Sequence, residues 1–190
     1  MNIRKAKPAE FKVITSHILL AMGELLDRFT GAQSMERASQ MMEKLVQKKG
    51  NQYSYENCWV AEDENGIAGS ALVYEGAKLH ELRKPVMAEI KSTFNINFQP
   101  EDETQAGEYY IDCVGVSPSR QGEGIGSKIF RFLIKEYTQD RNGTLGLLVD
   151  RDNPHAKKLY LKLGFEIVGE KTLAGKHMEH LQYRKKKEML

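Results

Sequence analysis

The glycine-rich stretch of this chain reads Ser117-Pro118-Ser119-Arg120-Gln121-Gly122-Glu123-Gly124-Ile125-Gly126. A nearly continuous apolar run over 109–116 precedes it and predicts a central strand that is covered on both faces. Apolar residues at helical spacing follow it and predict a helix over 127–137. A strand, a glycine turn and a helix in this order present backbone N–H groups at the positive end of the helix. The stretch therefore predicts a site for a phosphate or pyrophosphate group.

Two common phosphate-binding patterns do not fit this stretch. A Walker loop needs Lys and then Ser or Thr directly after its last glycine, whereas Ser127 and then Lys128 follow Gly126. The dinucleotide fingerprint needs a glycine at its sixth position, where a count from Gly122 finds Ser127. A plain turn without a ligand remains the alternative, because glycine tolerates positive φ. Glycines at three alternate positions exceed what such a turn requires.

Periodicity outside this stretch predicts one mixed α/β domain over residues 1–190. Strands are predicted at 2–6, 58–62, 67–74, 144–149, 165–168 and 180–183. Helices are predicted from Pro8 to about Phe29, from Ser34 to just before Gly50, over 79–94 with Pro85 starting or kinking it, and from Pro154 to a stop at Gly164. The polar segment 95–107 is interpreted as a loop.

The composition is that of a soluble globular protein, with 41% apolar and 28% charged residues. The 28 Lys and Arg against 26 Asp and Glu leave a net charge of +2, which gives no electrostatic reason to expect a nucleic-acid partner. Cys58 and Cys113 lie in apolar, strand-like runs and are interpreted as small buried residues in a reducing compartment. No apolar run reaches the roughly 18 residues of a membrane span, and no leader pattern follows Met1. We therefore expect a cytoplasmic protein with no membrane partner.

The histidines do not form a metal-ligand pattern. His177 and His180 lie three residues apart with no third ligand nearby, and they are interpreted as surface residues. His17 and His80 fall on predicted helices without partners. We therefore expect no metal site.

Two spaced motifs carry a resemblance to a known family. The first motif is Gln or Arg, two free positions, Gly, one free position, and Gly or Ala, and it is matched by Gln121-Gly122-Glu123-Gly124-Ile125-Gly126. The second is matched by Asn153-Pro154-His155-Ala156, Leu159-Tyr160 and Leu163-Gly164-Phe165. In this order the motifs resemble those of the GNAT family of N-acetyltransferases. The resemblance implies the acyl-CoA N-acyltransferase fold, a mixed, mostly antiparallel sheet of six to seven strands flanked by helices, with splayed fourth and fifth strands.

The resemblance also implies a reaction and its cofactor. Such a protein transfers the acetyl group of acetyl-CoA to a primary amine of a small molecule or peptide, by direct attack in a ternary complex and without a metal. The residues that would bind acetyl-CoA are Val114, Gly115, Val116, Gln121, Gly122, Glu123, Gly124, Ile125, Gly126, Ser127, Asn153 and Tyr160. Glu123 departs from the family, whose members often have a basic residue there, and this puts in doubt an extra ion pair to the pyrophosphate.

Three residues are candidates for moving protons. Tyr160 aligns with the tyrosine that protonates the leaving thiolate in this family, and the alternative is a core aromatic residue. Asp112, the one carboxylate inside its strand, is the candidate base, and Glu108 is a second one acting through a water. The alternative for Asp112 is hydrogen bonding to backbone or binding of a cationic substrate. Asn153 is interpreted as a helix cap, a contact for the pantetheine arm, or both.

A non-catalytic acyl-CoA-binding or sensor module is the rival interpretation. The acceptor pocket is expected from segments 29–56 and 76–107, whose sequences do not identify the acceptor. Several acidic residues between 75 and 103 indicate either a cationic acceptor or an ordinary solvated surface. The sequence leaves a homodimer open.

Overall fold

The computed structural model describes residues 1–23 and 34–185, and it contains a seven-stranded sheet. The strands lie in the order β1-β2-β3-β4-β5-β7-β6. Their bounds are Asn2–Lys5 (β1), Cys58–Asp63 (β2), Gly66–Glu75 (β3), Tyr109–Val116 (β4), Thr144–Asp150 (β5), Glu166–Leu173 (β6) and Lys176–Arg184 (β7). Neighbouring strands are antiparallel except for β4 and β5, which are parallel. The predicted mixed, mostly antiparallel sheet is confirmed.

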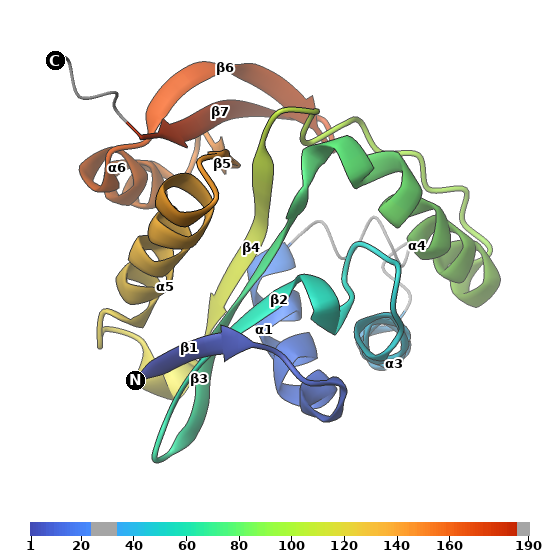
Figure 1. The fold of residues 1–190 in the computed structure, drawn as a ribbon. Helices are drawn as coiled ribbons and strands as arrows, with labels where there is room; N and C mark the ends of the chain where they lie inside the picture. The colour runs from blue at the N-terminus through green and yellow to red at the C-terminus, as the bar shows by residue number, and fades with distance from the viewer. Residues whose placement is uncertain (24–33, 186–190) are drawn as a thin grey trace, which may run out of the picture.

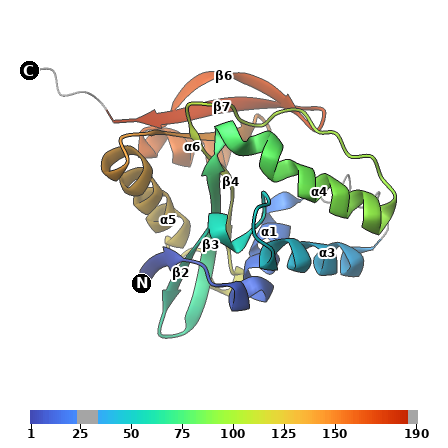
Figure 2. The same ribbon diagram turned by 45° about the vertical axis from the view of Figure 1, so that its right-hand side comes forward.

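Helices cover both faces of the sheet (Figure 1; Figure 2). One face carries α1 (Phe11–Met22), α3 (Met35–Gln47) and α4 (Leu79–Phe94), and the other carries α5 (Ile125–Ile134) and α6 (Pro154–Leu163). Alternate residues of a strand point to opposite faces. Val60 of β2 therefore belongs to the core under α1, α3 and α4, while its neighbour Trp59 belongs to the core under α5 and α6.

The two parallel strands pair over a short stretch and then separate. Their paired residues are Tyr109 with Leu145, Tyr110 with Gly146 and Ile111 with Leu147. Beyond these, β5 pairs with β7 alone, and β4 continues along β3 (Figure 1). The fourth and fifth strands are thus splayed, as the resemblance implied.

The predicted start of α3 and the predicted end of α6 are confirmed. The Ser34 Oγ accepts a hydrogen bond from the Arg37 N–H (3.3 Å) and caps α3. Gly164 ends α6 with a φ of 98°. The prediction for Pro85 is partly wrong, because α4 begins at Leu79 and Pro85 lies inside it. The predicted helix to Phe29 is observed to Met22, and residues 24–29 lie outside the described residues.

The last two strands are longer than the sequence indicates. The predicted strands 165–168 and 180–183 correspond to β6 and β7, which together form a hairpin over 166–184. β6 is an edge strand whose side chains are mostly exposed. Because an exposed strand needs no apolar alternation, its length is not visible in the sequence pattern.

Candidate functional site

The edge of β4 that faces β5 carries free backbone groups. The Ser117 N–H donates to the Ala68 carbonyl of β3 (2.9 Å), in the register of the β3–β4 ladder. Because bonded and non-bonded pairs alternate in such a ladder, the N–H and C=O of Val114 and Val116 face away from β3. Within the described residues, no residue of β5 pairs with them. The same register directs the backbone groups of Gly115 toward β3 instead.

A β-bulge places Asp112 on the face opposite to α5 and α6. Leu72 of β3 pairs with Cys113 and Val73 with Ile111, so Asp112 is an extra residue without a partner on β3. Cys113 packs in the core under α1 and α3, and Asp112 contacts groups on the same side. The valines beyond the bulge pack against the α5 core. The bulge thus places a carboxylate on one face of the sheet, and beyond it β4 remains paired with β3 and keeps its free edge at Val114 and Val116.

The glycine-rich turn lies directly before α5. Gly122 and Gly124 have φ values of 86° and 73°, a conformation that glycine adopts readily and other residues do not. The Lys128 N–H donates to the Gly124 carbonyl (3.1 Å), so the N–H groups of 125–127 have no intrahelical acceptor. Gly126 has no positive φ, and a Cβ there would meet no atom within 4 Å. The packing around this position therefore leaves room for a side chain.

Arg120 ties the glycine turn to the β2–β3 hairpin. Its guanidinium donates to Glu123 (2.7 Å to Oε1) and to Asp63 (2.8 Å to Oδ2). The hydrogen bond from Arg120 lowers the pKa of Glu123 from its usual range. The negative charge of Glu123 is therefore paired within the turn, and Arg120 brings a cation next to the position where the family often has one.

Asn153 and Tyr160 lie at the start and in the middle of α6. The Asn153 Oδ1 accepts a hydrogen bond from the Ala156 N–H (3.1 Å), so the helix-cap interpretation is confirmed. The Tyr160 ring packs on Phe130 (5.0 Å between centroids) and on Phe165 (6.1 Å). Its hydroxyl makes no hydrogen bond within the described residues, and burial raises its pKa to about 12. The ring is therefore packed, and the phenol stays protonated at neutral pH.

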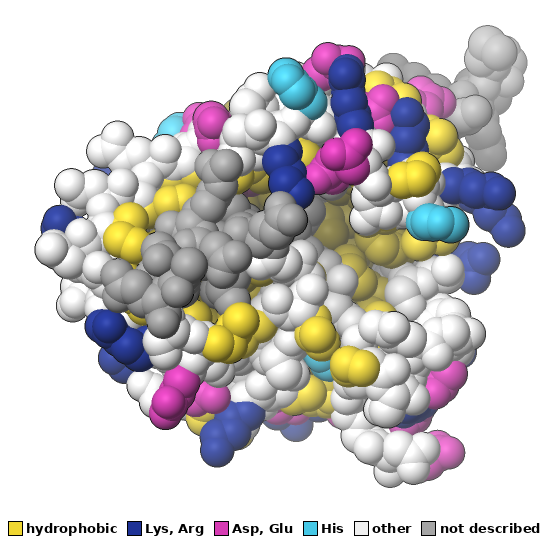
Figure 3. All heavy atoms as spheres, turned by 180° about the vertical axis from the view of Figure 1, so that it is seen from behind, with side chains coloured by type: hydrophobic (Ala, Val, Ile, Leu, Met, Phe, Trp, Pro, Cys, Tyr) yellow, Lys and Arg dark blue, Asp and Glu magenta, His cyan; other side chains and the backbone are white. Residues whose placement is uncertain are grey.

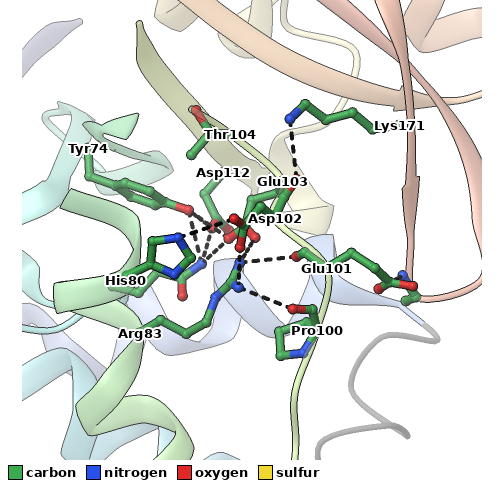
Figure 4. A network of polar contacts seen from close by, with 12 residues as sticks. Tyr74, His80, Arg83, Pro100, Glu101, Asp102, Glu103, Thr104, Asp112 and Lys171 are labelled. Atoms are coloured by element: carbon green, nitrogen blue, oxygen red, sulfur yellow. Dashed lines mark hydrogen bonds and ion pairs between the residues drawn. The ribbon is translucent and has the colours of Figure 1, made fainter. Parts of the chain in front are cut away.

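Asp112 belongs to a polar network between β4, α4 and the loop 95–108 (Figure 4). Its Oδ2 accepts hydrogen bonds from the Gln52 amide (2.9 Å) and the Tyr74 hydroxyl (3.1 Å). The same two donors reach Glu103 Oε1, at 2.7 and 2.9 Å. Arg83 pairs with the other oxygen of Glu103. The two carboxylates thus share the same hydrogen-bond donors, and the negative charge of Glu103 is in addition paired with the guanidinium of Arg83.

The pKa of Asp112 is raised to about 6, first by burial and then by the negative charge of Glu103. The hydrogen bonds from Gln52 and Tyr74 act in the opposite direction. Asp112 is therefore ionised at neutral pH, and it is a stronger base than an exposed aspartate with its usual pKa near 3.9.

A pocket of about 70 Å³ opens beside Asp112. Tyr53, Phe98 and Tyr110 supply aromatic parts of its wall, and Leu173 at the end of β6 supplies another part. Tyr53 and Phe98 lie within the segments expected to form the acceptor pocket and Tyr110 lies close to one of them, whereas Leu173 lies outside both. From behind, the molecular surface is hollowed beside the grey residues, and hydrophobic side chains line the hollow (Figure 3).

Glu108 lies apart from this pocket. Its fully buried carboxylate accepts hydrogen bonds from Thr104 (2.7 Å), His180 (2.8 Å) and Gln182 (2.7 Å). It fills the space above Gly146, where a Cβ would lie 2.1 Å from its Oε2. Burial alone would raise the pKa of Glu108, but these hydrogen bonds outweigh it and lower the pKa. This placement favours a structural role for Glu108 over that of a base.

We expect Glu108→Gln to lower stability by about 1–3 kcal/mol, because the new amide N–H₂ would face the donors His180 and Gln182. The loss of stability relative to the wild type should be largest above pH about 5. It should shrink as the pH falls below the ordinary Glu pKa of about 4.3, where the unfolded wild-type chain takes up a proton, and it should disappear once the pH passes below the lowered pKa of the folded state. Melting curves across pH test this, with the exposed Glu64→Gln as control. A large loss of turnover at unchanged stability would restore Glu108 as the base.

The sequence analysis assigned three histidines wrongly. The exposed His80, expected to have no partner, has its Nε2 3.2 Å from Asp102 Oδ2. His180 is buried and its Nε2–H donates to the Glu108 carboxylate, so it is not a surface residue. His17 is buried and contacts the hydroxyls of Ser70 (3.1 Å) and Ser117 (2.9 Å), so it is not without partners. Burial lowers the pKa of His17. His17 and His180 meet partners that lie more than 50 positions away in the chain. Local patterns cannot show such contacts.

Residues 1–23 and 34–185 contain no group of His, Cys, Asp and Glu arranged to hold a metal ion. None of their helices is both long and apolar enough for a membrane span.

Comparisons with known proteins agree with this geometry. The model of the acetyltransferase (GNAT) family matches residues 21–165. A solved structure described as an acetyltransferase has a TM-score of 0.82 and 26% identity, over 97% of this chain and 99% of that chain. The matched region contains β4, the glycine turn and the whole of α6 with its cap Asn153.

Two curated relatives share shorter segments with the chain. N-alpha-acetyltransferase RimI of Mycobacterium tuberculosis is 40% identical over 62 residues, which are 33% of this chain and 37% of that protein. A mycothiol acetyltransferase of Kytococcus sedentarius is 42% identical over 66 residues, which are 34% of this chain and 21% of that protein. The matches thus span about a third and a fifth of these relatives.

Proposed function

The chain belongs to the acetyltransferase (GNAT) family, and we propose that it transfers the acetyl group of acetyl-CoA to a primary amine. The acceptor is an amine of a small molecule or peptide, and it attacks directly in a ternary complex. The free edge of β4 beside the glycine turn is the observation that carries this proposal. The new bond joins the amine nitrogen to the acetyl carbon, the carbon–sulfur bond breaks, one proton leaves nitrogen and one reaches sulfur.

The residues around the splayed strands fit acetyl-CoA. It supplies an already activated thioester, so the protein must mainly position it and manage two protons. The N–H groups at the start of α5 are suited to its pyrophosphate, because they lack intrahelical acceptors at a positive helix end. The outward groups of Val114 and Val116 are suited to its amide arm, and an N–H of this edge is suited to the thioester oxygen.

Asp112 is the proposed base. It is ionised at neutral pH, its Oδ2 is held by two donors, and it lies two residues before Val114, the first of the edge residues on β4. An ordinary alkylamine has a pKa near 10.4. A carboxylate with a raised pKa is closer to that value, so transfer of the proton from the amine to the carboxylate is less unfavourable. Tyr160 is the proposed acid toward the leaving thiolate, because its hydroxyl is free within the described residues and stays protonated.

We expect Asp112→Asn to lower kcat by roughly 10- to 1,000-fold while leaving the affinity for CoA nearly unchanged. In the wild type, activity should be present above pH about 6 and should fall below it, because protonation of Asp112 removes the base. The variant should lack this acidic limb. Release of free thiol from acetyl-CoA with a panel of amines, measured across pH, provides the test. If only the acceptor KM rises, Asp112 binds the acceptor and another group is the base.

The same panel separates the proposal from the rival function. A folded protein that binds acetyl-CoA in calorimetry, yet releases no thiol with polyamines, amino acids, aminoglycosides or peptides, would be an acyl-CoA-binding or sensor module.

A further inference from the structure

We propose that His17 is a positioning residue for the CoA site, and that it acts through Ser117. The inference rests on the proposed function, because the site that His17 positions is the one proposed to hold CoA. It depends on the contacts of the His17 ring, on the place of Ser117 in the chain and on the packing of α1 against β4.

The imidazole of His17 is buried between α1 and the sheet, and both of its nitrogens are engaged. Its Nδ1 lies 3.1 Å from Ser70 Oγ of β3, and its Nε2 lies 2.9 Å from Ser117 Oγ. A hydroxyl can both donate and accept, so either tautomer of the neutral ring is satisfied. The neighbouring Ile14 and Ile18 of α1 belong to the apolar core. An apolar side chain would also fill this place, at a lower cost of desolvation, so packing alone does not call for a histidine here.

Ser117 joins the two parts of the proposed CoA site. It follows Val116, whose backbone groups face outward, and it precedes the glycine turn. Its N–H donates to the Ala68 carbonyl (2.9 Å), and its carbonyl accepts from the Arg120 N–H (2.9 Å). The outward edge before Ser117 is proposed to bind the amide arm of CoA, and the N–H groups after the turn its pyrophosphate. The position of Ser117 therefore determines how these two parts are spaced.

The hydroxyl of Ser117 is not used in its own turn. Ser117 is the N-cap of the 3₁₀ turn Pro118–Arg120, and a serine side chain at a cap commonly accepts a hydrogen bond from the turn that follows. Within the described residues, Ser117 makes no such side-chain bond. Its hydroxyl contacts His17 instead, 100 positions away in the chain. The end of β4 is thus attached to α1.

The backbone of α1 lies directly on β4 between the two edge residues. Gly115 separates Val114 from Val116, and a Cβ at Gly115 would lie 2.4 Å from the His17 carbonyl oxygen and 2.7 Å from the His17 Cβ. Only glycine allows so close an approach of two backbones. Beyond Ile111, no described residue of β5 pairs with β4. This end of β4 is therefore held by β3 along one edge and is covered by α1 on one face.

His17 fixes the end of β4 before CoA binds. Burial lowers the pKa of His17, so the ring is neutral at neutral pH and its contribution is geometric, not a charge for the pyrophosphate. Without the bond between His17 and Ser117, only backbone contacts hold the junction. CoA would then have to order the junction as it binds, and its affinity would fall.

The test uses two serine variants, each of which removes one partner of His17. Ser117→Ala and Ser70→Ala should lose comparable stability in melting curves, because each leaves one ring nitrogen unpaired. In calorimetry, Ser117→Ala should bind CoA about 3- to 10-fold more weakly, as expected for one neutral hydrogen bond, and Ser70→Ala less than about 2-fold more weakly. Equal weakening in both variants, or unchanged affinity in Ser117→Ala, would overturn the inference.

A double variant shows whether the two residues act as one unit. His17→Phe keeps a ring in the core, removes both contacts and should weaken CoA about as much as Ser117→Ala. The combination of His17→Phe with Ser117→Ala should bind no more weakly than either single variant, because both remove the same bond. Additive losses would mean that His17 does not act through Ser117. If His17→Phe does not fold, the two serine variants decide.

The wild type separates this inference from the proposed function. A wild-type protein that binds no CoA would contradict the proposed cofactor itself. A wild type that binds CoA, together with serine variants that bind it equally well, would contradict the role of His17 alone.

Discussion

Replacement of Tyr160 by Phe is expected to lower kcat by roughly 10- to 1,000-fold while the affinity for CoA changes much less. The phenylalanine keeps the packing of the ring on Phe130 and Phe165, so the melting temperature should barely move. The lost group is a hydroxyl that makes no hydrogen bond within the described residues. The effect should therefore lie in the departure of the thiolate. Steady-state kinetics with a good amine acceptor, combined with melting curves, measures both quantities.

Tyr160→Ala supplies the contrast. It removes the packed ring as well, and loss of a buried aromatic side chain costs about 3–5 kcal/mol. If Tyr160→Phe keeps nearly full turnover and Tyr160→Ala only melts earlier, the tyrosine is a packing residue. Water or another side chain would then protonate the thiolate.

Gly124→Val is expected to abolish detectable binding of acetyl-CoA and CoA. The φ of 73° at Gly124 is disfavoured for a β-branched residue, so the turn would change and its N–H groups would no longer face one ligand. Calorimetry on the folded variant decides the question. Unchanged affinity would mean that the glycine stretch is a plain turn.

Variants at two further glycines distinguish the two possible causes of lost binding, which are backbone strain and a side chain that blocks the ligand. Gly50→Val, after α3 on the opposite face of the sheet from α5, introduces comparable strain at a φ of 70° and should leave CoA affinity intact. Gly126→Val introduces no positive-φ strain and meets no protein atom, so it should keep stability and lose affinity. If Gly126→Val binds CoA normally, close approach of the ligand is not the reason for this glycine.

The sequence predicted the positions of those candidate site residues that belong to short sequence motifs. The glycine turn, the Asn153 cap and Tyr160 lie on neighbouring elements because short motifs specify them directly. The splay of β4 and β5 followed from the resemblance and not from periodicity. The length of β6 was missed, since its exposed side chains leave no apolar pattern.

Contacts between distant segments account for the rest. Arg83 and Glu103 form a buried ion pair from α4 and a loop, although each appears in the sequence as one more charged residue. Glu108 was a candidate base by its position before the strand, and only the fold shows the enclosing Thr104, His180 and Gln182. The bulge at Asp112 also depends on pairing with β3.

The β-bulge at Asp112 makes the choice of side chain at this position independent of the pairing between β3 and β4. Because Asp112 has no partner on β3, a different residue at 112, or none, would leave the pairs of Cys113 and Ile111 as they are. The backbone edge at Val114 and Val116 would keep its position. A single codon thus controls the charge offered to the acceptor without altering the half of the molecule proposed to hold acetyl-CoA. In evolutionary terms, the carboxylate proposed to act on the acceptor can be gained or lost in one small step while the proposed binding of one acyl donor is retained.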